Sequence, residues 1–245
     1  MMERFQASPE FRRGRPWCVA VPWPFMPLIL LSAFGVVAAA ALLLDRFLPQ
    51  RLPGLLIQAI LQASMVATVL LMFALIPPLG RIAGKTGMRK ISLSDLKFVL
   101  LGLLLIHAWN ILSMPLWNLL IQTLERSLDL SFEQRQKELG ICSGSSLPEL
   151  LGLLALLAVL IPFVEEVVYR RLLFGVFRPL GVWPALIYTA LIFAAMHGFV
   201  YGFPALLGLG IVFQWQYLRT ENLWTSALTH MIFNATSVTL VSLYG

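Results

Sequence analysis

LLGLLALLAVLIPFVEEVVYRRLLFGVF, residues 150–177, is an apolar run that nevertheless contains Glu165, Glu166, Arg170 and Arg171. A helix needs about 20 mostly apolar residues to cross the ~30 Å hydrocarbon core of a bilayer, and this run is long enough. A charged side chain at the bilayer centre costs about 2.5 to 3.5 kcal/mol on insertion scales. The charged residues therefore indicate a candidate functional site inside a membrane helix.

The composition of the whole chain excludes an ordinary soluble domain. Of its 245 residues, 59% are hydrophobic and 12% are charged, and the mean hydropathy is +0.83. Runs such as VVAAAALLL (36–44) lack the alternation that a membrane β-barrel requires. We therefore expect an all-α, polytopic transmembrane bundle of about seven helices (about six to eight). They are predicted near residues 25–44, 54–76, 98–123, 148–172, 181–198, 203–218 and 223–243.

Polar residues divide the chain into three segments. Residues 1–24 form the predicted cytoplasmic N-terminal segment. Residues 25–147 hold the N-terminal transmembrane helices and loops, in which few polar side chains fall within apolar spans. Residues 148–245 carry most of the polar side chains that lie inside apolar helices. We find no internal repeat. The last segment is therefore the predicted functional core of the protein.

The basic residues predict an orientation in the membrane. If the N-terminus is cytoplasmic, most of the 18 Lys and Arg residues fall on the cytoplasmic side, in agreement with the positive-inside rule. The net charge of +6 then reflects topology and contact with anionic lipid, not nucleic-acid binding. Cys18 and Cys142 fall on opposite sides, so no disulfide is expected. We predict an integral protein of a bacterial cytoplasmic (inner) membrane.

The fourth predicted helix contains the motif EExxxR. Glu166 and Arg170 are four residues apart with the acid first, the order that favours an i,i+4 ion pair. Glu165 is rotated by about 100° from Glu166 and meets Tyr169 on its own face, so it has no cation there. Pro162 lacks an N–H group and should free a backbone carbonyl near the acids. Spacing alone does not decide which glutamate faces water, and a purely structural ion pair is the alternative.

Two further motifs follow on the fifth and last predicted helices. Phe193 precedes His197 by one turn, so its ring can pack against the imidazole. His230 and Asn234 are also one turn apart, and two such donors can hold an oxyanion. The alternatives are helix-to-helix hydrogen bonding by His197 and a polar clamp by the second pair. His107 has no acid nearby in its helix and is expected to be structural.

The motifs EExxxR, FxxxH and HxxxN, in this order on three membrane helices, resemble those of the CAAX prenyl protease and bacteriocin-processing (CPBP, or Abi) family of intramembrane proteases. The resemblance covers roughly residues 148–240 and includes YLRTENLWTSALTHMIFN (217–234). The family commonly has glycine after its arginine, whereas this chain has Arg171. This departure concerns packing or lipid contact and removes no catalytic group.

The resemblance implies a membrane-embedded endopeptidase. Glu165 would be the general base and would activate a water together with His197. His230 and Asn234 would stabilise the oxyanion. The supporting residues would be Glu166, Arg170 and Phe193.

No cofactor is expected to be required. Glu165, His197 and His230 could in principle hold a divalent metal such as zinc with an open water position. The chain lacks H-E-x-x-H, and the resemblance favours a metal-free glutamate mechanism. The expected partners are the lipid bilayer and a membrane-associated protein or peptide, such as a lipidated protein or a leader peptide, with no nucleic acid.

Two other functions compete with the protease. A catalytically silent scaffold or immunity protein of the same fold should have lost the motifs, and all of them are present. A proton-coupled transporter could use Glu165 and His197 as a relay, but it has no support from repeats or from polar residues in the first three helices.

The depths of the histidines impose a geometric condition on a shared site. If the fifth helix runs straight from residue 181, His197 lies about 24 Å along it, whereas His230 lies only about 10 to 12 Å from the cytoplasmic side. We therefore predict that the fourth and fifth helices are not simple full-depth spans.

Overall fold

The computed structural model describes residues 88–129 and 147–244, together with 63–64, 67–68 and 71. All regular secondary structure in these ranges is helical, as predicted. The segment 1–24, the predicted helix 25–44 and most of the predicted helix 54–76 lie outside the described residues. The total of about seven helices therefore stays a prediction.

Five helical stretches match the predicted ones. They are α6 (Leu93–Leu128), a long fourth helix that ends with a 3-10 turn, α11 (Val182–Met196), α12 (Phe203–Thr220) and α13 (Leu223–Tyr244). The fourth helix consists of α8 (Leu147–Leu153), the π-helical segment η2 (Leu154–Leu160), α9 (Ile161–Glu166), the π-helical segment η3 (Val167–Leu173), α10 (Phe174–Phe177) and the 3-10 turn η4 (Arg178–Leu180).

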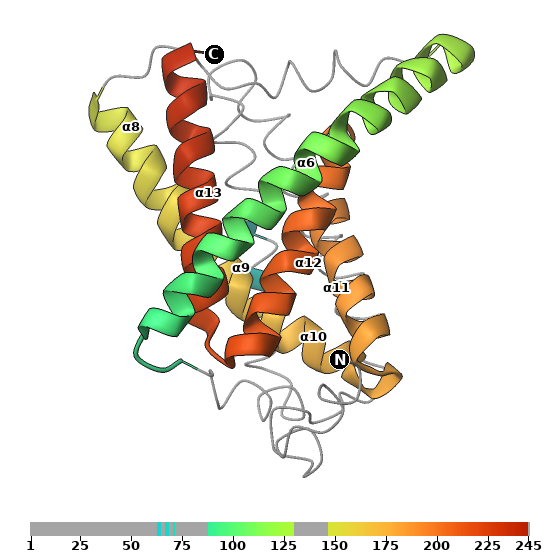
Figure 1. The fold of residues 1–245 in the computed structure, drawn as a ribbon. Helices are drawn as coiled ribbons and strands as arrows, with labels where there is room; N and C mark the ends of the chain where they lie inside the picture. Colours follow the sequence, from blue (N-terminus) through green and yellow to red (C-terminus); the bar gives the residue numbers. More distant parts are fainter. Residues whose placement is uncertain (1–62, 65–66, 69–70, 72–87, 130–146, 245) are drawn as a thin grey trace.

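Successive helices from the fourth onward run in alternating directions (Figure 1). α11 packs against α12 and α10, α12 packs against α13, and α13 packs against the fourth helix. α6 crosses obliquely over α12 and α13 and contacts both. The site-bearing helices are therefore packed directly against one another.

Among the residues that the structure describes, two helices are long and apolar enough to cross a membrane, Leu93–Leu128 and Leu150–Phe177. α11 has only 15 residues, or about 22 Å, and is shorter than a full bilayer span. The fourth helix is interrupted by two π-helical segments. α11 is thus shorter than a full-depth span, as predicted, whereas the fourth helix is long enough to span and is irregular only through its π-helical segments.

α6 begins with a capping box. Ser92 accepts a hydrogen bond from the Asp95 backbone N–H, and the Asp95 side chain accepts one from the Ser92 backbone N–H. Asp95 is buried, and Arg89 donates two hydrogen bonds to its carboxylate at 2.8 and 2.7 Å. Arg89 also donates to the Thr220 carbonyl at 3.1 Å. This end of α6 is therefore tied to the α12–α13 turn.

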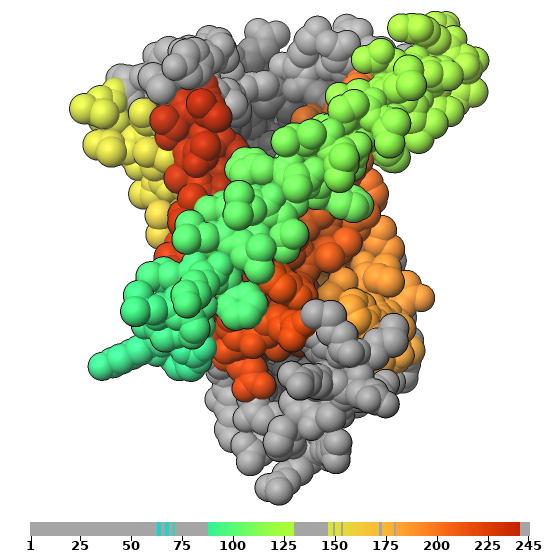
Figure 2. All heavy atoms as spheres, viewed as in Figure 1, coloured from blue at the N-terminus to red at the C-terminus, as the bar shows by residue number. Residues whose placement is uncertain are grey.

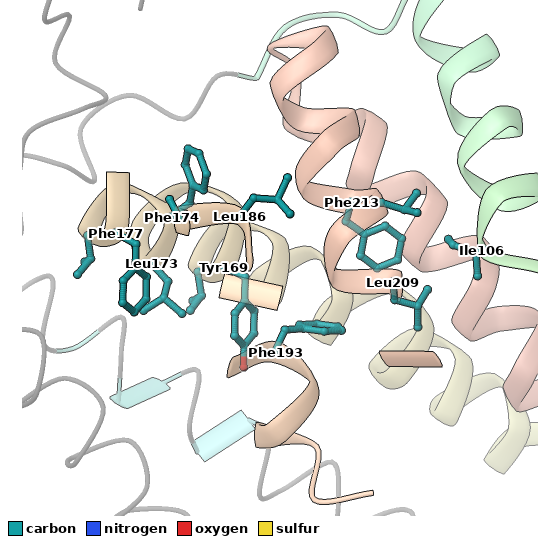
Figure 3. Close-up of a cluster of buried hydrophobic side chains, with 13 residues drawn as sticks. Ile106, Tyr169, Leu173, Phe174, Phe177, Leu186, Phe193, Leu209 and Phe213 are labelled. Atoms are coloured by element: carbon teal, nitrogen blue, oxygen red, sulfur yellow. The ribbon is translucent and has the colours of Figure 1, made fainter. Parts of the chain in front are cut away.

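Buried aromatic rings fill the space between the fourth helix, α11 and α12 (Figure 3). Phe193 lies among them with no exposed surface, and its ring makes edge contacts with Tyr169 at 5.0 Å and Phe213 at 6.4 Å. α11 and α12 approach closely at Gly210, where a Cβ atom would lie 2.9 Å from the Ala190 Cα. Glycine is needed there because a side chain would push the two helices apart.

Candidate functional site

Glu165 and Glu166 end the short α9 segment, which lies between the two π-helical segments. Both side chains are buried, with 1% and 0% of their residue surface exposed. π-helical turns are rare and are frequent at functional sites, because they redirect side chains relative to a regular helix. The helix is thus irregular on both sides of the two carboxylates.

Glu166 is held by two partners. Arg170 Nε donates to Glu166 Oε2 at 3.0 Å, which confirms the ion pair predicted from the i,i+4 spacing. His230 Nδ1 lies 3.2 Å from Glu166 Oε1, and because an ionised carboxylate only accepts, the Nδ1–H group is the donor. Arg170 Nη1 also donates to the Gly210 carbonyl at 3.1 Å. Glu166 therefore links the fourth helix to α13, and Arg170 links it to α12.

Glu165 has fewer hydrogen-bond partners than Glu166. Its Oε2 lies 3.8 Å from His230 Nε2, beyond hydrogen-bonding distance. Its Oε1 has no hydrogen-bond partner within the described part of the chain. Spacing left open which glutamate could face water, and the geometry favours Glu165 because both oxygens of Glu166 are engaged.

An aromatic cage surrounds the Arg170 guanidinium. Its Cζ lies 5.0 Å from the Phe193 ring centroid, 5.4 Å from that of Phe213 and 5.8 Å from that of Tyr169, all within cation–π range. Phe213 also stacks on the His230 imidazole, with centroids 4.7 Å apart and planes inclined by 27°. Phe213 could not be predicted as part of the site from the sequence, since a phenylalanine inside an apolar helix carries no local signal of such a contact.

His197 directly follows the last residue of α11. Its Nδ1 lies 2.7 Å from the Phe193 carbonyl oxygen, so the Nδ1–H group donates to it and Nε2 is left without this proton. The His197 ring packs against the Phe193 ring at 4.6 Å, as predicted, and the His230 ring lies 5.9 Å from the same Phe193 ring. Phe193 thus brings the two imidazoles into one cluster.

Asn234 binds the fourth helix. Its Nδ2 donates to the Leu157 carbonyl at 3.0 Å. In the π-helical register of η2 a carbonyl accepts from the residue five positions later, which for Leu157 is Pro162, a residue without an N–H group. Asn234 therefore supplies the donor that Pro162 lacks. This is the polar-clamp geometry that the sequence analysis kept as the alternative.

His107 and Arg171 are the two remaining residues that the sequence singled out. His107 is on the exposed side of α6 with its ring 6.2 Å from that of Phe233, in line with its structural interpretation. Arg171, where the resembling family commonly has glycine, is 3% exposed. Its side chain is therefore packed inside the protein.

Residues 147–236, which contain the two glutamates, Arg170, both cluster histidines and Asn234, match the family model "Type II CAAX prenyl endopeptidase Rce1-like". This part of the chain is therefore similar to the CAAX protease family. The family match implies a protease, and together with the two apolar helices it indicates a membrane protein. No curated protein and no solved structure gives a significant match to the chain.

The arrangement of the acidic and histidine side chains also bears on metal binding. Among the described residues, no group of three His, Cys, Asp or Glu side chains is arranged to hold a metal ion. Glu165, His197 and His230 therefore do not form such a group. Nδ1 of each histidine is engaged, by the Phe193 carbonyl and by Glu166, but metal-bound histidines make the same contacts, so the poor fit rests on the lack of convergence alone. The side chains in this arrangement do not fit a three-ligand site, and no reaction step is derived through a metal.

Proposed function

We propose that this protein is an intramembrane endopeptidase that hydrolyses peptide bonds with a water activated by Glu165. The observation that carries the proposal is a buried carboxylate with one unpartnered oxygen, placed beside a histidine inside an apolar helix. Such a group is costly in a membrane and is retained at functional sites. The CAAX protease match supports the same reaction class.

The proposed reaction uses Glu165 in two proton transfers. The carboxylate takes a proton from water while the water oxygen attacks the peptide carbonyl carbon, and the carbonyl π electrons move to its oxygen. The tetrahedral intermediate then collapses and the C–N bond breaks. Glu165 returns the proton to the leaving nitrogen. The products are a new carboxyl terminus and a new amino terminus.

Charge balance supports a shared proton between Glu165 and His230. Glu166 is paired with Arg170, and one additional proton on the Glu165–His230 pair would balance the remaining charge of Glu165. Because Glu166 holds Nδ1, His230 directs Nε2 toward Glu165, and a protonated Nε2 would donate to the oxyanion. We assign His230 this role, with His197 as the second group that orients the water.

Asn234 receives a different assignment from the one that the resemblance implied. Because its amide already donates to the Leu157 carbonyl, we propose that it positions the fourth helix against α13 and so places the acids opposite His230. A primary amide has a second N–H, so an oxyanion contact by Asn234 is a testable alternative.

The proposed setting is a bacterial cytoplasmic membrane with the N-terminus inside. The first residue of α6 and the last residues of α10 and α12 lie at one end of the bundle (Figure 1). Basic residues gather near these helix ends: Arg89, Lys90, Arg178 and Arg219. The proposed substrates are membrane-associated proteins, lipidated or carrying leader peptides, and no metal is required.

The test compares protein termini in host membranes that lack this protein and are complemented with wild type, Glu165→Gln or Glu221→Gln at matched expression. Glu221→Gln is the control because this carboxylate is exposed in the α12–α13 turn. We expect new termini with wild type and Glu221→Gln only. The purified enzyme should then cleave the identified peptide with and without a zinc chelator. If Glu165→Gln produces the same termini as wild type, the proposed mechanism is wrong. If neither wild type nor any variant produces new termini, the protein is a non-catalytic scaffold and not a protease.

A further inference from the structure

The loop that joins α11 to α12 comprises residues 197–202 and begins with His197. Gly198, its second residue, has a φ of +63°, the left-handed conformation in which helices commonly end. The His197 backbone N–H donates to the Ala194 carbonyl at 3.3 Å, a long bond of the kind found at helix ends. Contacts to the rest of the loop therefore matter for where the His197 imidazole lies.

α6 makes two hydrogen bonds to this loop. Trp117 Nε1 donates to the Val200 carbonyl at 2.8 Å, and Tyr201 donates its hydroxyl proton to Glu125 Oε2 at 2.5 Å. A hydroxyl that donates to an ionised carboxylate makes a bond about twice as strong as a neutral one. Trp117 also stacks on Phe203, the first residue of α12, with ring centroids 5.8 Å apart. Each contact joins residues far apart in sequence.

α6 lies outside the region that matches the CAAX protease model, which begins at residue 147. The sequence of the first half of the chain predicts only generic membrane helices. Yet α6 holds the loop from which His197 projects, and it does so with two side chains of its C-terminal half, Trp117 and Glu125.

We propose that Trp117, Glu125 and Tyr201 are positioning residues, through which α6 fixes the 197–202 loop and with it the His197 imidazole. The inference rests on the proposed function for its catalytic consequence, but the positioning itself can be measured without any substrate. Loss of these contacts lets the loop shift, and a misplacement of about 1 Å at a catalytic group can lower the rate by about 100-fold.

The first test reads the position of His197 directly. The chain has three histidines, so ¹⁵N-histidine labelling of the full-length protein in micelles gives few imidazole signals, which single His→Gln variants assign. Trp117→Phe keeps the stacking on Phe203 and removes the donor. Tyr201→Phe removes the other donor. We expect both variants to shift or broaden the His197 signals and to leave those of His107 in place.

Trp109→Phe is the matched control. Trp109 also lies on α6 and donates its indole N–H at 2.7 Å, but its acceptor is the Pro204 carbonyl inside α12. This variant should destabilise the protein about as much as Trp117→Phe without moving the His197 signals. Unchanged His197 signals in both loop variants, or equal changes in the control, would overturn the proposal.

The second test measures turnover of a peptide identified by its new termini. Trp117→Phe and Tyr201→Phe should lower kcat about 10-fold or more and change KM less than about twofold, because the loop places a catalytic group. Glu125→Gln keeps an acceptor and should lose less activity than Tyr201→Phe, and combining these two should cost no more than Tyr201→Phe alone. Lower thermal stability with normal kcat would show that the contacts are only structural. If wild type cleaves nothing, the proposed function fails while the histidine signals still decide the positioning.

Discussion

α6 and the fourth helix are both apolar and long enough to cross a membrane, but the protein uses them differently. α6 is α-helical from Leu93 to Leu128 and exposes much of its apolar surface, including Ile111, Leu112 and Leu116 (Figure 2). The fourth helix changes between α- and π-helical turns and buries two glutamates and two arginines. In the most apolar 18-residue stretch of each helix, 17% is buried in α6 and 35% is buried in the fourth helix.

This difference shows what hydropathy measures and what it leaves out. Apolar length indicates that a helix can cross a membrane, whereas the buried charges indicate which helix bears the site. α6 contributes through polar groups on one side, namely its tryptophan donors and Glu125. The following substitutions test this division, from the largest expected effect to the smallest.

Glu165→Gln should have the largest effect, on the side of the fourth helix. The amide cannot accept a proton from water, and removal of a general base typically lowers rates by about 10²- to 10⁴-fold. We expect kcat on an identified peptide to fall at least about 1000-fold with normal folding. A residual activity above one tenth of wild type would assign the proton transfer to another group.

Arg170→Met should mainly reduce stability. It leaves Glu166 buried beside His230 without its arginine, and breaking a buried pair costs about 3 to 5 kcal/mol. Thermal unfolding in micelles should show this loss, and Glu166→Gln added to Arg170→Met should recover part of it. If the double variant is no more stable than the single one, the pair is not the source of the loss.

Phe213→Leu and Phe177→Leu form a matched comparison within one core. Both remove a buried ring, so both should cost about 1 to 3 kcal/mol of unfolding free energy. Only Phe213 stacks on His230, whereas Phe177 packs near Tyr188. We expect kcat to fall about 10-fold further in Phe213→Leu. Equal kcat values in the two variants would make Phe213 an ordinary core residue.

Asn234→Leu should cost about 1 to 3 kcal/mol, because the Leu157 carbonyl loses its donor. Pro162→Ala restores a backbone N–H to the helix, so the double variant should regain stability and activity relative to Asn234→Leu alone. The measurements are unfolding midpoints and kcat for all four forms. Recovery of stability without activity would instead support a direct oxyanion contact by Asn234.

Leu112→Ala on α6 should have the smallest effect. The Leu112 side chain is 71% exposed in the bundle, so truncation leaves no internal cavity and should change stability by less than about 0.5 kcal/mol. Thermal unfolding and kcat should both stay near wild type. A loss of about 2 kcal/mol or more would mean that this face is packed against protein, and the contrast with the fourth helix would weaken.

The sequence predicted the helical class, the five described spans and the Glu166–Arg170 pair, because hydropathy and i,i+4 spacing act locally along the chain. It also predicted the packing of Phe193 on His197. It could not predict Phe213 on His230 or the loop contacts of Trp117 and Glu125, since these join residues from different helices. It also could not predict that Asn234, on another helix, donates to the Leu157 carbonyl that Pro162 leaves without a donor.

The shortness of α11 has a consequence for the surrounding lipid. A helix of about 22 Å is some 8 Å shorter than an average hydrocarbon core, and such a mismatch is relieved when the bilayer thins locally. Lipid headgroups and bulk water would then approach the end of α11, where His197 lies. A hydrolase inside a membrane needs a supply of water, and a thinned annulus beside α11 would provide a short route for it.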